Sequence, residues 1–213
     1  MNRLFATIPV AILLALSANA KHPVSLFDGK TLNGWIQIPT NSWEVKAGVI
    51  ASLGKGRGVL YTTNQYDRYR LMPTARHLNG KPDHKPGVLF FCTAPTEGQK
   101  PADALGGIQF QMPTGGHCDY RKGHNNSGDG FAPFPRGAAN FHEWSRVELL
   151  VDAKTGTARV AVAQPINSEA VEVGVFKDPT AGKLGRSPCK CTTPVCLTSI
   201  RISRLKLTRL STT

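Results

Sequence analysis

The fold is decided by one stretch of alternating side chains, Val147-Glu148-Leu149-Leu150-Val151-Asp152-Ala153-Lys154-Thr155-Gly156-Thr157-Ala158-Arg159-Val160-Ala161-Val162. Apolar residues take every second position on both sides of a polar turn that contains a glycine. A period of two places successive side chains on opposite faces of a β-strand. We therefore predict a hairpin with strands at 145–152 and 157–164.

The rest of the chain repeats this kind of pattern. Gly and Pro recur every eight to fifteen residues, and the segments between them are rich in Val, Ile, Leu, Phe and Thr. This spacing predicts an all-β sandwich or barrel with no helix longer than two turns. Further strands are expected at 42–45, 49–53, 58–62, 69–75, 87–93, 107–112, 171–176 and 198–210.

The last of these strands carries a change of parity. Its apolar residues alternate at Ile200 and Ile202, and then again at Leu205 and Leu207, which are out of phase with the first pair. One extra residue at 203–204 would restore the alternation, so we predict a β-bulge there.

Size and composition fit one compact domain at 21–213. The chain has 213 residues, of which 40% are hydrophobic and 19% charged, so a disordered polyelectrolyte is excluded. A chain of this length buries roughly 70% of its unfolded surface and needs neither disulfides nor metals to fold.

Residues 1–20 have the features of a signal peptide. A basic start, Met1-Asn2-Arg3, precedes a short apolar run, and Ala18-Asn19-Ala20 provides a small-x-small cleavage site. The run is too short for a membrane span, and no later segment is apolar enough to form one. We expect cleavage after Ala20 and a periplasmic or secreted mature protein.

Five cysteines are consistent with export, where disulfides are favoured. The odd number leaves at least one without an intramolecular partner. The cluster Cys189-x-Cys191-x4-Cys196 could form a local disulfide, remain as inert thiols, or hold a metal through three thiolates.

Positive charge is concentrated late in the chain. The net charge is +12 and becomes +11 when Arg3 is removed with the leader, and no acidic residue follows Asp178. Seven basic residues follow it: Lys183, Arg186, Lys190, Arg201, Arg204, Lys206 and Arg209. This excess predicts a basic patch that associates with an anionic cell envelope. No nucleic-acid motif accompanies it, so nucleic acid is not expected as a partner.

Segments along nearly all of the mature chain resemble a known family. The segments are Phe27-Asp28-Gly29-Lys30-Thr31-Leu32-Asn33-Gly34-Trp35, Trp43-Glu44-Val45, Gly58-Val59-Leu60-Tyr61, Gly87-Val88-Leu89-Phe90-Phe91, Gly107-Ile108-Gln109-Phe110-Gln111 and Glu143-Trp144-Ser145. In this order they resemble the 3-keto-disaccharide hydrolase family, also known as domain of unknown function 1080. The resemblance implies a concanavalin A-like, jelly-roll β-sandwich that acts on 3-keto-glycosides.

The implied chemistry is an elimination followed by hydration. A ketone at C3 acidifies the proton at C2, so a base can remove that proton and expel the substituent at C1. This route needs a general base, donors for the enolate oxygen and an acid for the leaving group. The family's Glu-x-Gln pattern is Gln109-Phe110-Gln111 here. A neutral amide is no base, so the carboxylate has either been lost or moved.

Candidate site residues lie on and after this segment. Gln109 and Gln111 are two apart on a strand, so they share a face where their amides could bind sugar hydroxyls. The polar loop at 115–130 could supply a base and its orienting groups. The predicted catalytic residues are His117, His124 and Asp119, and the predicted substrate-binding residues are Gln109, Gln111, Arg121, Tyr120 and Asp129.

Two other interpretations of the 115–130 loop remain. Its His, Asp and Asn residues could hold a divalent metal, or they could form a solvated turn region, although no cofactor is expected overall. We predict an exported hydrolase, or a lyase with hydratase activity, that cleaves 3-keto-disaccharides. The alternative is a carbohydrate-binding β-sandwich that has lost the catalytic carboxylates, and a third hypothesis is a structural envelope protein.

Overall fold

The computed structural model describes residues 24–54, 58–78, 87–92, 98, 107–113, 118–121, 129–130, 139–140, 142–177, 196–198 and 201–209. For 118–121, 129–130, 196–198 and 201–209 it gives the backbone and the strand register. The described residues form β-strands and turns, as the all-β prediction requires. None of the described segments is a helix long and apolar enough to cross a bilayer.

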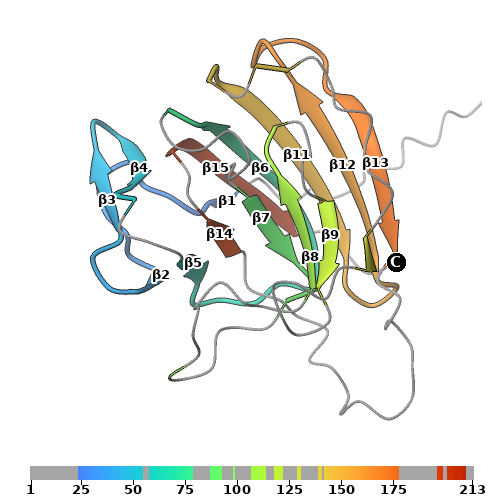
Figure 1. The fold of residues 1–213 in the computed structure, drawn as a ribbon, viewed down its shortest axis with the longest axis horizontal. Coiled ribbons are helices and arrows are strands. Elements are labelled where there is room, and N and C mark those ends of the chain that lie inside the picture. The colour runs from blue at the N-terminus through green and yellow to red at the C-terminus, as the bar shows by residue number, and fades with distance from the viewer. Residues whose placement is uncertain are drawn as a thin grey trace, which may run out of the picture.

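The strands build two antiparallel sheets that face each other (Figure 1). Sheet A consists of β13 (Val171–Lys177), β12 (Thr157–Ala163), β11 (Ser145–Asp152), β6 (Arg68–Arg76), β15 (Arg201–Arg209), β4 (Val49–Ser52) and β3 (Trp43–Lys46) in spatial order, with β1 (Val24–Ser25) paired to β15. Sheet B consists of β10 (Asp129–Gly130), β9 (Cys118–Arg121), β8 (Gly107–Gln111), β7 (Gly87–Phe90), β14 (Cys196–Thr198), β5 (Val59–Thr62) and β2 (Trp35–Ile38).

The predicted hairpin is confirmed as β11 and β12. The two strands pair antiparallel, with Leu149 opposite Val160. Val147, Leu149 and Val151 are completely buried, as are Ala158 and Val160 on the partner strand. The alternating pattern therefore marks the face of sheet A that packs on sheet B.

One hydrophobic core lies between the sheets. Sheet A contributes Tyr69, Leu71 and Leu149, and sheet B contributes Phe90 and Phe110, all of them at most 1% exposed. The rings of Phe90 in β7 and Phe176 in β13 meet edge to face, with 5.7 Å between their centroids. This contact joins the two layers directly, an arrangement that adds about 0.5–1.5 kcal/mol beyond buried area.

The predicted C-terminal strand is corrected by the structure. A single strand was expected at 198–210, but this region forms β14 and β15, which belong to different sheets. β14 lies between β5 and β7 of sheet B, and β15 lies between β4 and β6 of sheet A. The predicted bulge is confirmed, since the register of β15 against β6 shifts between Ile202 and Arg204.

The polar segment at 115–130 was predicted to be a loop, and this is wrong for two parts of it. Residues 118–121 form β9 and residues 129–130 form β10, which together make one edge of sheet B. The period-two signal is weak here because Cys118-Asp119-Tyr120-Arg121 has no plain apolar alternation. β1 and β2, near the start of the described chain, were also missed.

The opening motif of the mature chain is a tight turn. One carboxylate oxygen of Asp28, Oδ1, accepts hydrogen bonds from the backbone N–H groups of Lys30 and Thr31, both at 2.7 Å. The other, Oδ2, accepts one from the Thr31 hydroxyl, also at 2.7 Å. Gly29 supplies the left-handed backbone of the turn with φ of 80°. These bonds to the charged form hold the pKa of Asp28 at about 2.

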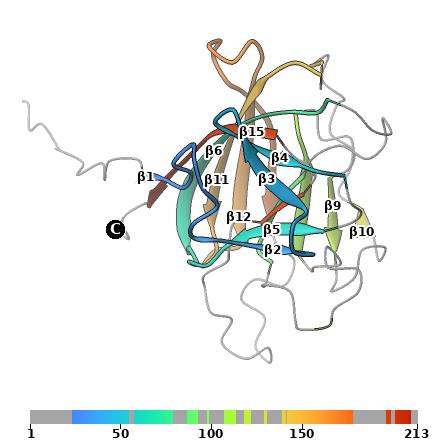
Figure 2. The ribbon, with the colours of Figure 1, turned by 90° about the vertical axis from the view of Figure 1, so that its left-hand side faces the viewer.

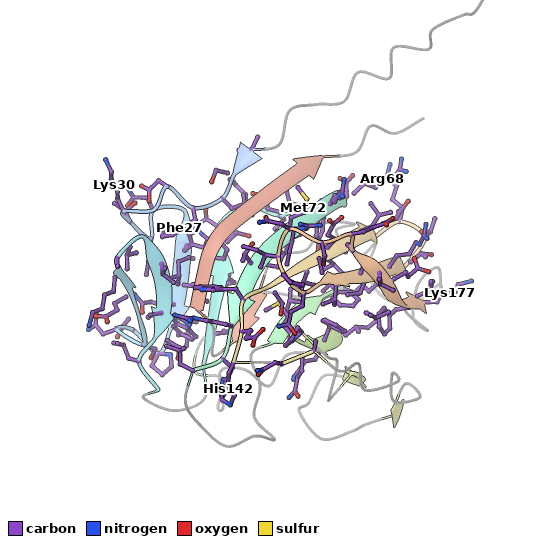
Figure 3. The ribbon with its side chains drawn as sticks, turned by 90° about the horizontal axis from the view of Figure 1, so that it is seen from above. Phe27, Lys30, Arg68, Met72, His142 and Lys177 are labelled. Atoms are coloured by element: carbon purple, nitrogen blue, oxygen red, sulfur yellow. The ribbon has the colours of Figure 1, made fainter. Side chains whose placement is uncertain are left out.

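The turn is anchored on both sides. Phe27, directly before Asp28, is buried in the core, and the indole Nε1–H of Trp35 donates to the carbonyl of Leu26 at 2.7 Å. Figure 3 shows Phe27 and Lys30 near one end of the molecule, away from Arg68 and Lys177 at the other. The motif therefore fixes how the chain enters the sandwich.

The Asp28 turn predicts a specific acid response. The folded-state pKa of about 2 lies below the ordinary value of 3.8, so the stabilising effect of ionised Asp28 is complete above pH 4 and is lost as the pH falls through about 2. A carboxyl-detected NMR titration should give a midpoint near 2 for Asp28. Thr31→Val, which removes only the hydroxyl donor, should raise that midpoint, whereas a wild-type midpoint close to 3.8 would contradict the turn.

Candidate functional site

Strand β8 has two buried faces with different chemistry. Ile108 and Phe110 are fully buried in the core between the sheets. Gln109 and Gln111 alternate with them and therefore lie on the opposite, outer face of sheet B. Each glutamine is only 6% exposed, so the outer face is covered at these positions as well.

A second, smaller apolar cluster lies on this outer face. It consists of Val59, Tyr61, Leu89 and Cys92, with Ile38 packed against it. Three strands, β2, β5 and β7, contribute to it. Leu89 of this cluster is directly opposite Gln109, so the two buried amides of β8 lie beside a buried apolar cluster on the same face.

The register of the strands shows which residues of each strand in sheet B lie on this outer face. One row of directly opposed residues runs through all seven strands, in the order Gly130, Asp119, Gln109, Leu89, Cys196, Tyr61 and Ile36. Directly opposed residues share a face of a sheet. Figure 2, turned by 90° from Figure 1, shows β5 and β2 at one side of this layer and β9 and β10 at the other.

The register sorts the residues predicted for the site into two sets. Asp119 is opposite Gln109, and Arg121 is opposite Gly107, so both occupy positions on the outer face together with Gln111. Tyr120 is opposite Ile108, and Asp129 is opposite Tyr120, which gives both of them positions of core-facing parity. The predicted set is therefore divided between the two faces of sheet B.

Charge on the outer face is sparse. Among the described strands of sheet B, the outer positions of β2, β5, β14, β7 and β8 hold apolar, glycine, cysteine, threonine or amide residues. Asp119 and Arg121 on β9 are the charged residues at outer positions in these described strands. One carboxylate and one guanidinium thus come from the strand beside the two glutamines.

The buried amide of Gln111 has an unusual feature. Its oxygen Oε1 is buried and, among the described residues, has no hydrogen-bond partner. Such an atom costs about 1–3 kcal/mol if nothing satisfies it. The residue opposite Gln111 across the sheet is Gly87.

Two predicted catalytic residues, His117 and His124, lie outside the described residues. Within the part of the chain that the structure describes, no three His, Cys, Asp or Glu residues gather as metal ligands. Most of the 115–130 segment falls outside that part, so the metal alternative stays a prediction.

Sequence reasoning missed the apolar half of the site. Tyr61 and Leu89 were assigned only to strands, yet they lie in the same row as Gln109 and Asp119. The signal was present in β5 and β7, where apolar residues occupy consecutive positions in Val59-Leu60-Tyr61 and Val88-Leu89-Phe90. Such continuous runs indicate a strand that is buried on both faces.

Several solved structures have a fold similar to that of this chain. The exoplasmic domain of VIP36 with bound Ca²⁺ and Man3GlcNAc aligns with a TM-score of 0.58 at 11% identity, covering 84% of this chain and 85% of that one. Lectin II from Ulex europaeus gives 0.55 at 11% identity, with 90% and 100% covered. A protein of Parabacteroides distasonis, provisionally assigned as a glycosyl hydrolase, gives 0.55 at 15% identity, with 89% and 100% covered.

These likenesses establish a concanavalin A-like β-sandwich, as predicted, and at such low identity they establish the fold alone. No protein of curated function matches the sequence. The model of the 3-keto-α-glucoside-1,2-lyase-like domain matches residues 22–188, which is most of the chain. This protein therefore belongs to the family of 3-keto-α-glucoside-1,2-lyase-like domains, also called 3-keto-disaccharide hydrolases.

Proposed function

We propose that the protein is an exported enzyme that cleaves 3-keto-glycosides on the outer face of sheet B. Family membership supports the reaction class. The observation that carries the site is the register row in which Asp119 stands directly opposite Gln109, beside the buried cluster of Tyr61 and Leu89. Amides, one carboxylate and apolar surface together suit a sugar ring.

In the proposed reaction, Asp119 acts as the base. The ketone at C3 makes the C2 proton acidic, and the carboxylate accepts that proton while the bond from C1 to the leaving oxygen breaks. Arg121 stabilises the negative charge on the enolate oxygen, and the leaving oxygen takes up a proton from water. Addition of water to the resulting double bond completes a net hydrolysis.

We infer that Asp119 takes the place of the missing family carboxylate. In this chain position 109 is a glutamine, and Asp119 is the residue opposite it across the strand pair. Directly opposed residues have Cβ atoms about 4.5–5.5 Å apart. The acid group would therefore be displaced by one strand and not lost. His117 and His124 remain the alternative bases.

The non-catalytic alternative rests on the same face. Gln109 and Gln111 are neutral, and the unpartnered Oε1 of Gln111 is suited to accept a hydrogen bond from a saccharide hydroxyl. A domain that used only these groups would bind a sugar without cleaving it. Binding without product separates the two functions.

A second candidate function, attachment to an anionic envelope polymer, involves the outer face of sheet A. Arg70 and Arg146 share one carboxylate, Glu148, while Arg68 pairs with Asp152 at 3.1 Å. Burial raises the pKa of Glu148, but the hydrogen bonds and charges of the two arginines outweigh this and hold the pKa below its usual range. Each of these carboxylates is thus already neutralised.

Additional positive charge on this face comes from β15. Arg204 is opposite Thr74 and Lys206 is opposite Met72, so both hold outer positions beside Arg70. The basic residues of the face outnumber its carboxylates. An anionic polysaccharide would therefore bind here through charges that salt screens.

The catalytic proposal is tested with mature protein and a 3-keto-disaccharide, with free reducing sugar and the unsaturated intermediate as readouts. Asp119→Asn should lower kcat about 10²–10⁴-fold, because the base is removed. Gln109→Glu combined with Asp119→Asn should restore part of the activity by returning a carboxylate to the opposite strand. Full activity of Asp119→Asn together with inactivity of His117→Ala or His124→Ala would assign the base to histidine instead.

Gln111 provides a test that separates binding from folding. Gln111→Met removes a buried, unsatisfied oxygen, so the free energy of unfolding should stay equal or rise by up to about 1 kcal/mol. Saccharide affinity, measured by calorimetry, should fall about 2–13-fold through the lost hydrogen bond. Leu149→Ala, in the core, should cost about 2–5 kcal/mol in the same denaturation assay. Loss of stability in Gln111→Met would mean that Oε1 has a structural partner.

The envelope candidate predicts steep salt dependence. Retention on an immobilised anionic polysaccharide should fall as NaCl rises from 50 to 300 mM, whereas a neutral polysaccharide should retain nothing at either concentration. Arg204→Glu with Lys206→Glu should abolish retention. Lys30→Glu changes an exposed lysine in the Asp28 turn, outside the strands of sheet A, and should leave retention intact; equal loss in both variants would contradict a localised face.

A further inference from the structure

The arginines whose side chains the structure describes fall into two groups. Most of them form an ion pair with a carboxylate: Arg68, Arg70, Arg146 and Arg159. Arg76, the last residue of β6, forms none with the described residues. Its guanidinium carbon instead lies 4.7 Å from the centre of the Trp144 ring. No described carboxylate therefore neutralises the charge of Arg76.

A hydrogen-bonded turn places Trp144 beside Arg76. The side-chain nitrogen Nε2 of Gln164 donates to the carbonyl of Asn140 at 2.7 Å and to the hydroxyl of Ser145 at 2.8 Å. Ser145 is 1% exposed and is the first residue of β11 to pair with β6. The fold thus fixes the position of the indole, and both Trp144 and Arg76 remain partly exposed.

A second arginine position lies on the other side of Arg76. In the register of β15 against β6, Arg201 is directly opposite Arg76. Ala75, which precedes Arg76, is buried in the core, so this pair of positions lies on the outer face of sheet A. Like charges directly opposite each other destabilise a sheet. An anion shared by the two positions would offset this repulsion.

The two acids nearest to this pair leave Arg76 without an ion pair. Glu143 precedes Trp144, and its Oε1 accepts a hydrogen bond from the Nδ2 of Asn140 at 3.4 Å. Glu44 belongs to the same row of opposed residues as Arg76, but on β3, three strands away. Three strand spacings amount to about 14 Å. The guanidinium of Arg76 is therefore available to an external anion.

We propose that this end of the outer face of sheet A binds the carboxylate of an acidic saccharide at Arg76. The Nε of Arg76 is buried, so the carboxylate would contact the terminal nitrogens, Nη1 and Nη2. Two parallel hydrogen bonds of this kind are among the strongest in proteins. The contact with Trp144 orients the guanidinium, and the exposed part of the indole offers an apolar surface to the sugar ring.

This site deepens the second candidate function and rests on it, since it names the group of an anionic polymer that the face would recognise. Inorganic anions could use the guanidinium, but they have no ring to place on Trp144. An acidic saccharide uses both parts of the site. It should therefore bind more tightly than a free anion of equal or higher charge.

Titration of the mature protein with D-glucuronate, D-glucose and sodium sulfate at constant ionic strength tests the ligand class. The readout is the NMR signal of the Trp144 indole N–H, assigned with Trp144→Phe. Glucuronate should shift this signal saturably and leave those of Trp35 and Trp43 in place, whereas glucose should have no effect. An absent shift with glucuronate, an equal shift with glucose, or sulfate binding as tight as that of glucuronate would overturn the proposal.

Variants of Arg76 test the residue. Arg76→Met should weaken glucuronate binding about 10–150-fold, because it removes charge-assisted hydrogen bonds. Arg76→Lys keeps the charge without the planar fork and should weaken it less. Arg159→Met is the matched control, since it removes the same charge from the same face at a residue that already pairs with Glu172. Unchanged affinity in Arg76→Met, or equal weakening in Arg159→Met, would overturn the site.

Retention on an immobilised anionic polysaccharide separates this site from the function on which it rests. Wild-type retention that Arg76→Met keeps and Arg204→Glu with Lys206→Glu loses would contradict the site and support attachment. Glucuronate binding at Arg76 without any retention of the wild type would support the site and contradict attachment. Cleavage of a 3-keto-disaccharide should be unchanged in Arg76→Met, because the proposed catalytic face belongs to the other sheet.

Discussion

Strand pairing by β14 and β15 holds both sheets together. Without β14, sheet B would separate into β2–β5 and β7–β10, and without β15, sheet A would lose β3 and β4 from the larger group around β6. Both strands lie late in the chain, yet each bonds to neighbours on both sides. Contacts of such long sequence separation slow folding, because loop closure is costly before the contacts form.

The candidate site depends on this closure. β14 joins the apolar strand β5 to β7 and β8, so Tyr61 and Gln109 come to share one row only when β14 is in place. The inner face of sheet B is used for the core, while its outer face holds a second buried cluster and two amides. Because both faces of sheet B are buried at these positions, the two amides lie apart from the core between the sheets.

Strands with a clear period of two could be predicted from sequence, and β11 and β12 match to within one residue. The same reasoning located the bulge in β15, because the alternation of its apolar residues changes phase at one point and one extra residue there restores it. It failed for β9, because Cys118-Asp119-Tyr120-Arg121 shows no clear alternation of apolar and polar residues. Only its pairing with β8 shows which of its positions share a face with Gln109. The pairing of Asp119 with Gln109 could not be predicted in this way, because the periodicity of one strand does not determine its register with the neighbouring strand.

The Asp28 turn has a consequence for how proteins of this kind are recognised. Its carboxylate is fully engaged by backbone and hydroxyl donors of its own turn, and its neighbour Phe27 is buried in the core. The most distinctive motif of the chain therefore reports on architecture and lies apart from the outer face of sheet B. Selection for folding can preserve such a motif while catalytic groups migrate between strands. Family membership recognised from this motif would then not depend on which residues serve as the catalytic acid and base.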